Sequence, residues 1–267
     1  MHNSGLANRS LTPESKKDVK REGGGGMLFV GLLFGVVICF GVPIGGVVML
    51  GRRKKGMGKA FLPGALAFVI SQLLIRIPLL KFVLPQYAWY GVLQLNPWTY
   101  GLFLGLTAGL FEETARWIAI CFFLKGKQER EHGLAFGLGH GGIEAIVLVG
   151  VPLLGAALQL FTDKAALPFV GAGSLFIIGI ERLFAITFHV GASLLVMYGV
   201  RRRKPLFLLA AIFLHTLLDA AVVILPAVWG TAIAGIEVCA AFMAAITLFA
   251  GIRCYQATNC HCAPRIF

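Results

Sequence analysis

The sequence predicts an all-α, polytopic membrane protein with about seven transmembrane helices. Of its 267 residues, 58% are hydrophobic and only 13% are charged, and the mean hydropathy is +0.83. A soluble domain has about 25% charged residues, so this composition indicates a lipid environment. Each of the long apolar runs reaches the roughly 20 residues that cross about 30 Å of hydrocarbon. They lie at 27–50, 60–84, 98–124, 133–160, 169–200, 205–225 and 230–252.

The chain divides into a transmembrane domain, residues 27–252, and two polar ends. Residues 1–26 are polar and finish in four glycines, a composition that predicts a disordered tail on a flexible tether. Residues 253–267 are expected to form a short cytoplasmic tail. The fifth apolar run is too long for one straight span, and Pro168 at its start predicts a bent or tilted first turn.

Lysine and arginine gather in alternate loops, and this alternation predicts the orientation. The positive-inside rule places these basic loops in the cytoplasm, the N-terminus outside and the C-terminus inside a plasma membrane. Since the basic residues stand in short clusters between apolar runs, the net charge of +12 is typical of a topology signal and does not indicate nucleic-acid binding. The clusters are Arg52 to Lys59, Lys125 to Arg130 and Arg201 to Lys204, whereas the opposite loops contain only Lys81 and Lys164.

The third apolar run carries three charged residues near its middle, namely Glu112, Glu113 and Arg116. A charge at the bilayer centre costs between about 2.5 and more than 10 kcal/mol, so such residues are rare and usually functional. Three neighbouring runs carry further polar residues at a similar depth, about 10–21 Å from the cytoplasmic surface at 1.5 Å per helical residue. These are His140, Glu144, His189, His215 and Asp219. We therefore expect a four-helix catalytic core.

Helical spacing suggests how these groups pair. Arg116 follows the two glutamates by three and four residues, so it can neutralise one carboxylate and leave the other suited to taking a proton from water. His140 with Glu144, and His215 with Asp219, are also four residues apart. In each pair the carboxylate could fix the tautomer of the histidine.

The three imidazoles of His140, His189 and His215 could hold a metal ion or stabilise an oxyanion. The sequence requires no cofactor, although a divalent metal such as zinc would suit these groups. Each group also has a structural interpretation, as an ion pair between helices or as a core histidine. Glu181 and Arg182 could pair with each other or with Arg76, and the isolated Glu237 is either structural or lines a lumen.

Four motifs in the third to sixth runs are similar to those of the PrsW and YhfC intramembrane peptidases, relatives of the superfamily of CAAX-processing and bacteriocin-processing proteases. His140 in the second motif and the Glu-Arg pair before His189 make the chain resemble the YhfC family in particular. The motifs are Glu-Glu-Thr-Ala-Arg at 112–116, the glycine-rich segment 137–144, the segment 181–189 and His-Thr-Leu-Leu-Asp at 215–219.

This resemblance implies an intramembrane endopeptidase that cleaves a membrane-embedded or membrane-associated protein or peptide. Glu113, narrowly preferred, or Glu112 would activate water, and His189 and His215 would stabilise the oxyanion or bind a metal. Asp219 would orient His215, and Arg116 would position the glutamates. Two other functions fit the residues alone. Intramembrane carboxylates and histidines also build proton- or ion-coupled transporters, and a peptidase-like protein could bind a partner without cleaving it, as an immunity or signalling protein.

Overall fold

The computed structural model describes residues 26–162 and 171–260, and every regular element in these ranges is a helix. Within them, six helices are long and apolar enough to cross a membrane: Gly26–Arg53, Gly58–Gln86, Arg130–Gln159, Gly173–Arg202, Leu206–Trp229 and Ile233–Gln256. This confirms the predicted class of an all-α, multi-pass membrane protein. The N-terminal tail up to residue 25, the bend at Pro168 and residues 261–267 of the C-terminal tail lie outside the described residues.

A further long helix, α5 (Pro97–Phe123), has 27 residues and is therefore about 40 Å long. It is long enough to cross the membrane, but its centre carries the charged residues predicted to form the site. Asn96 caps its first turn, because its side chain accepts hydrogen bonds from the backbone N–H groups of Trp98 and Thr99. Pro97 at the first helical position lacks an N–H that the helix would leave unpaired.

Several spans are not uniform α-helices. The first contains a π-helical turn, η1 (Val37–Gly41), before α2 (Val42–Arg53). Such π-helical turns are frequent at functional sites. The other elements are α3 (Gly58–Phe68), η2 (Val69–Arg76), η3 (Leu79–Val83), η4 (Leu84–Gln86), α4 (Ala88–Gln94), α6 (Arg130–Ala145), η5 (Ile146–Gly150), α7 (Val151–Thr162), α8 (Ala172–Arg202), α9 (Leu206–Trp229) and α10 (Ile233–Cys260). The last helix continues past residue 252, the predicted end of the last span.

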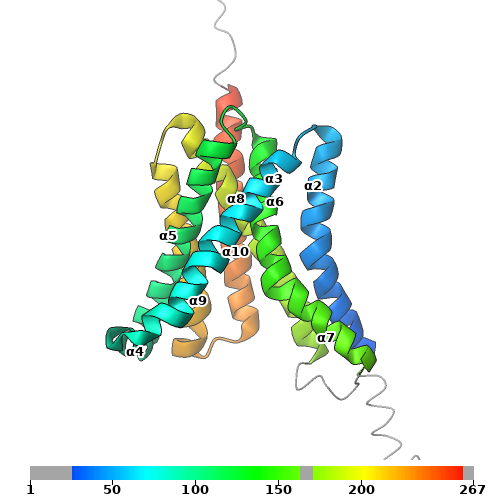
Figure 1. The fold of residues 1–267 in the computed structure, drawn as a ribbon, viewed down its shortest axis with the longest axis vertical. Helices are drawn as coiled ribbons and strands as arrows, with labels where there is room; N and C mark the ends of the chain where they lie inside the picture. Colours follow the sequence, from blue (N-terminus) through cyan, green and yellow to red (C-terminus); the bar gives the residue numbers. More distant parts are fainter. Residues whose placement is uncertain (1–25, 163–170, 261–267) are drawn as a thin grey trace, which may run out of the picture.

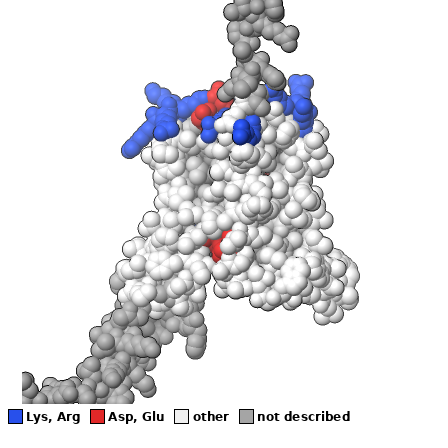
Figure 2. All heavy atoms as spheres, turned by 180° about the vertical axis from the view of Figure 1, so that it is seen from behind, with Lys and Arg blue, Asp and Glu red and all other residues white. Residues whose placement is uncertain are grey.

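The helices form one bundle in which α5 packs along α9, α3 along α6, and α8 between α6 and α10 (Figure 1). Ile120, Phe136 and Met197, from α5, α6 and α8, are buried in its apolar core. The loops after α2, α5 and α8 lie at one end of the bundle, and α4 lies at the other. Lysine and arginine side chains gather at the first end, as Figure 2 shows. We call this the basic end.

Glycines of α6 let two neighbouring helices approach its backbone. A Cβ atom on Gly139 would lie 2.8 Å from the carbonyl carbon of Phe61 in α3, and one on Gly137 would lie 2.9 Å from the carbonyl oxygen of His189 in α8. Small residues serve the same purpose at helix contacts in other membrane proteins. The glycine-rich segment therefore allows α6 to bring His140 and Glu144 close to α3 and α8.

We predict that Gly139→Ala destabilises the protein, because the new methyl group meets the backbone of Phe61, which cannot rotate away. Overpacking of this kind costs about 1–3 kcal/mol. Thermal unfolding of the detergent-solubilised protein should show a lower midpoint. Gly155→Ala in α7 is the matched control, since its Cβ would meet nothing within 4 Å. Equal midpoints for both variants would contradict the close approach of α3 and α6.

Candidate metal centre

Arg116 and Glu113 form a completely buried ion pair at the centre of the bundle. Arg116 Nε donates to Glu113 Oε2 at 2.8 Å and Nη2 donates to Oε1 at 3.1 Å, and both side chains are fully inaccessible. The same guanidinium reaches α8, where it bonds to the carbonyl oxygen of His189 and the hydroxyl of Ser193. On the other side, Glu113 Oε1 lies 2.9 Å from Nδ1 of His215 in α9. Arg116 therefore neutralises Glu113, as one of the predicted pairings had it.

Glu112 lies at the meeting point of four side chains. Its Oε2 is 2.9 Å from His140 Nε2 and 4.0 Å from His189 Nδ1. Its Oε1 is 3.7 Å from His215 Nε2 and accepts a hydrogen bond from the Gln72 amide. The structure thus gives the second glutamate of the pair four partners, contributed by η2, α6, α8 and α9.

Glu144 does not pair with His140, which corrects the expectation drawn from their four-residue spacing. Glu144 Oε2 lies 2.6 Å from Nε2 of His189, and its Oε1 accepts a hydrogen bond of 3.1 Å from Arg182. Arg182 in turn pairs with Glu181, its neighbour in the chain. His140 Nε2 lies instead 2.9 Å from Oε2 of Glu112, so its partner comes from α5 and not from the next turn of its own helix.

Asp219 is also placed differently from the role that the resemblance implied. Its Oδ1 is 3.9 Å from His215 Nε2, which is too far for a hydrogen bond that would orient the ring. The other nitrogen of the ring, Nδ1, is held by Glu113 at 2.9 Å. Asp219 is 36% exposed and lies on the wall of a cavity, so its carboxylate is accessible to water.

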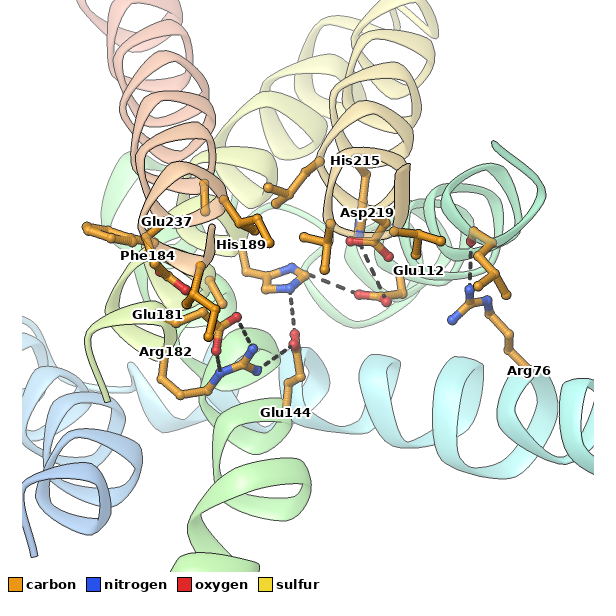
Figure 3. A pocket seen from close by; sticks show the side chains of 18 residues that line it. Arg76, Glu112, Glu144, Glu181, Arg182, Phe184, His189, His215, Asp219 and Glu237 are labelled. Atoms are coloured by element: carbon orange, nitrogen blue, oxygen red, sulfur yellow. Dashed lines mark hydrogen bonds and ion pairs between the residues drawn. The ribbon is translucent and has the colours of Figure 1, made fainter. Parts of the chain in front are cut away.

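The cavity has a volume of about 480 Å³ and lies between η2, α5, α6, α8, α9 and α10 (Figure 3). Its polar wall consists of Arg76, Glu112, Glu144, Glu181, Arg182, His189, His215, Asp219 and Glu237. Of the predicted site residues, Glu113, Arg116 and His140 do not line it; they lie behind the wall and contact residues that do. Glu237 therefore lines the cavity, as one of its two interpretations had it.

Glu112, His189 and His215 could hold a metal ion, because each offers one ligand atom and these atoms lie within 4.8 Å of one another. Two imidazoles and one carboxylate are a ligand set of catalytic zinc sites, in which water takes the fourth position. One nitrogen of each histidine faces a carboxylate, Nδ1 of His215 facing Glu113 and Nε2 of His189 facing Glu144, as is usual for metal-binding histidines. The remaining nitrogen of His189, Nδ1, lies 3.0 Å from Arg116 Nη2. The expected ligand set differed from this group, since it named His140 and omitted Glu112.

The charge of the site also favours a cation. The carboxylates that line the cavity or contact its wall are Glu112, Glu113, Glu144, Glu181, Asp219 and Glu237, against the guanidinium groups of Arg76, Arg116 and Arg182. This excess of formal negative charge in a bilayer has to be balanced by protons or by a bound cation.

Sequence reasoning missed two residues of the site, Gln72 and Arg76 of η2. Gln72 is 3% exposed and donates to Glu112, and Arg76 lines the cavity and donates to Gln72. The available signal was their four-residue spacing inside an apolar run, which places both on one face. Arg76 was considered only as a partner for Glu181 or Arg182, whereas it contacts η2 and α5.

Fold and site together define a multi-pass membrane protein whose buried His-His-Glu group could hold a metal ion. The family model described as "YhfC intramembrane metalloprotease" matches residues 38–165 and 156–240, which is more than half of the chain. The chain therefore belongs to the YhfC intramembrane metalloprotease family, and the predicted resemblance to this family is confirmed.

A curated relative supports this membership. The chain is 32% identical over 233 residues to the "Uncharacterized membrane protein YhfC" of Bacillus subtilis (strain 168), an alignment that covers 79% of this chain and 90% of the relative. No solved structure matches the chain at a significant level.

We predict that Arg116→Met destabilises the bundle strongly, because it leaves the Glu113 carboxylate buried without its cation. Breaking a buried ion pair in this way costs about 3–5 kcal/mol. The midpoint of denaturant unfolding in detergent micelles should fall, and the double variant with Glu113→Gln should regain part of the loss. Lys125→Met, at an exposed position in the loop after α5, is the control. An Arg116→Met protein as stable as this control would contradict the structural role of the pair.

Proposed function

We propose that this chain hydrolyses a peptide bond of a membrane-embedded or membrane-associated protein or peptide, and that Glu112, His189 and His215 form its reaction centre. The observation that carries this proposal is that the three side chains come from α5, α8 and α9, yet place their ligand atoms within 4.8 Å at the wall of one cavity. Membership of a family described as intramembrane metalloproteases supports the reaction class.

Glu112, His189 and His215 would hold a divalent cation such as zinc. When bound at such a site, the ion polarises a carbonyl group and makes its water ligand acidic enough to ionise near neutral pH. Carboxylates of the protein would orient the two imidazoles. Glu113, behind the cavity wall, faces His215 Nδ1, and Glu144, on the wall, faces His189 Nε2, so each carboxylate can hold a proton on the nitrogen that it faces.

Among the carboxylates, Asp219 is best placed to accept the proton of the attacking water. It lines the cavity, it is 36% exposed, and its Oδ1 lies 3.9 Å from His215 Nε2 at the reaction centre. Asp219 could then return this proton to the leaving amine, as general acid–base catalysis requires. Glu113, which we narrowly preferred as the base from the sequence, is fully buried behind the wall, and both of its oxygens accept hydrogen bonds from Arg116.

The substrate would reach this centre from the end opposite to the basic end. From the reaction centre, the cavity wall continues along α9 through Val222 and Val223 and onto α10 at Ile233 and Ile236. These residues lie toward the turn between α9 and α10, at the far end from the basic loops. Since positive-inside reasoning places the basic end in the cytoplasm, we propose that the cavity opens toward the extracytoplasmic side.

We predict that Glu112→Gln and Asp219→Asn both abolish cleavage, but that they differ in metal content. Glu112→Gln removes a charged ligand, so the purified protein should lose its bound zinc or cobalt. Asp219→Asn removes a proton acceptor, so cleavage should fall by at least about 100-fold while the metal is retained. Elemental analysis of the detergent-purified protein measures the metal, and cleavage of membrane proteins can be compared by quantitative proteomics of expressing cells.

Glu131→Gln, in the first turn of α6 and away from the cavity, is the matched control for these variants. Removal of the metal with a chelator should abolish cleavage by the wild-type protein, and zinc should restore it. A chelator-treated enzyme that still cleaves would exclude a metal from the mechanism. A Glu112→Gln variant with wild-type cleavage would refute the reaction centre itself.

The orientation can be tested without activity. In a background whose native cysteines are replaced by alanine, we expect Ala240→Cys, on the cavity wall, to react with a membrane-impermeant thiol reagent in intact cells. Lys125→Cys, in a loop of the basic end, should react only after the cells are opened. The reverse pattern would show that the cavity opens toward the cytoplasm.

A further inference from the structure

We propose that Gln72 and Arg76 form a positioning arm that fixes the Glu112 carboxylate for metal binding. This inference rests on the proposed function, because it assigns Glu112 as a ligand. The inference goes beyond the proposed function because it names two residues that would set the metal affinity of the site. Both lie on a helix that contributes no ligand. The segment η2 carries both residues and ends at Arg76.

The Gln72 amide is held in one orientation. Its Nε2 donates to Glu112 Oε1, and its Oε1 accepts a hydrogen bond of 3.1 Å from Arg76 Nη1. The two ends of an amide differ in kind, since the oxygen only accepts and the nitrogen only donates. A guanidinium group can only donate, so Arg76 requires the amide oxygen on its own side and thereby turns the NH₂ group toward Glu112. The side chain is 3% exposed, which leaves little room for other rotamers.

Arg76 is itself fixed to α5, the helix that carries Glu112. Its Nε donates to Thr107 Oγ1 at 3.1 Å and its Nη2 donates to the carbonyl oxygen of Leu104 at 2.6 Å. Leu104 and Thr107 lie one to two turns before Glu112 on α5. The arm therefore starts and ends on the same helix, so a movement of η2 alone cannot separate Gln72 from Glu112 without breaking the contacts of Arg76.

The arm supplies a hydrogen bond to Glu112 without supplying a charge at the carboxylate. Gln72 donates to Oε1 of Glu112, and His140 Nε2 lies 2.9 Å from Oε2. With a neutral imidazole at His140, each oxygen of Glu112 therefore receives one uncharged donor. Each oxygen then keeps acceptor capacity on the side of His189 and His215. Glu113 is different, because Arg116 binds both of its oxygens directly. Gln72 stands between the Arg76 guanidinium and Glu112 in this chain of hydrogen bonds. The negative charge of Glu112 therefore remains available to a cation.

The test is the affinity of the purified protein for zinc or cobalt, measured in detergent by competition with a chromophoric chelator. Gln72→Met keeps the length of the side chain but removes the donor, and it should weaken binding by about 10- to 100-fold, as loss of an outer hydrogen bond to a metal ligand does. Arg76→Met should also weaken binding. The double variant should bind as Gln72→Met does, because Arg76 acts through Gln72.

Ser71→Ala is the matched control. Ser71 is the neighbour of Gln72 and is similarly buried, but its hydroxyl donates to the main-chain oxygens of Ala67 and Phe68, at the end of α3. This variant should retain wild-type affinity.

A purely structural role for Gln72 would lower the unfolding midpoint without changing the metal affinity. If Gln72→Met does not fold, the metal affinities of Arg76→Met and of the conservative Arg76→Lys are compared with that of Ser71→Ala. The loss of affinity should be smaller for lysine than for methionine.

Two results would overturn the inference. One is a Gln72→Met protein, or in its place an Arg76→Met protein, that binds metal as tightly as Ser71→Ala. The other is a double variant in which the two losses multiply, since Arg76 would then act independently of Gln72. A wild-type protein that binds neither zinc nor cobalt would be a different failure, because it would refute the metal centre of the proposed function and this arm with it.

Discussion

The site depends on the buried pair of Arg116 and Glu113. Two charges with no accessible surface are costly in a bilayer unless each is satisfied by the other and by further hydrogen bonds. Arg116 meets this requirement by bonding to the His189 carbonyl oxygen and the Ser193 hydroxyl of α8, and Glu113 meets it through His215 of α9. The pair therefore fixes α5 against α8 and α9 at the depth of Glu112, His189 and His215, so structural stability and the position of the two histidines have the same physical origin.

The same construction occurs three times around the centre. Each of the three groups that could bind the metal is held by a second polar residue, which is held in turn by an arginine: Arg116, Glu113 and His215; Arg182, Glu144 and His189; and Arg76, Gln72 and Glu112. A carboxylate is the middle residue where the ligand is an imidazole that can donate a proton. A neutral amide is the middle residue where the ligand is itself a carboxylate, because a second negative charge would repel it. The chemistry of the ligand thus determines the residue behind it.

Much of the fold could be predicted from the sequence, because lipid selects for long apolar runs and for basic loops on one side. Depth could also be counted along the helices, which is why Glu112, His189 and His215 were predicted to meet. Pairing could not be predicted in the same way. The four-residue spacing of His140 and Glu144 indicated one partner, but their partners come from other helices, Glu112 of α5 for His140 and His189 of α8 for Glu144. Gln72 was missed because an isolated glutamine in an apolar run does not indicate a site until the carboxylate that it contacts is known.

This organisation also explains how α5 can carry charged residues at its centre. A helix that carries two glutamates and an arginine can remain in a bilayer only where other helices surround its centre, and Glu113 and Arg116 have no accessible surface. The neighbours of α5 include α3, η2, α8 and α9, and the last three of these contribute Gln72, His189 and His215. Shielding the charges of α5 from lipid and bringing Glu112 together with His189 and His215 are therefore one structural requirement. On the cavity wall at the same layer Asp219 is 36% exposed, whereas Glu113 and Arg116 behind the wall have no accessible surface.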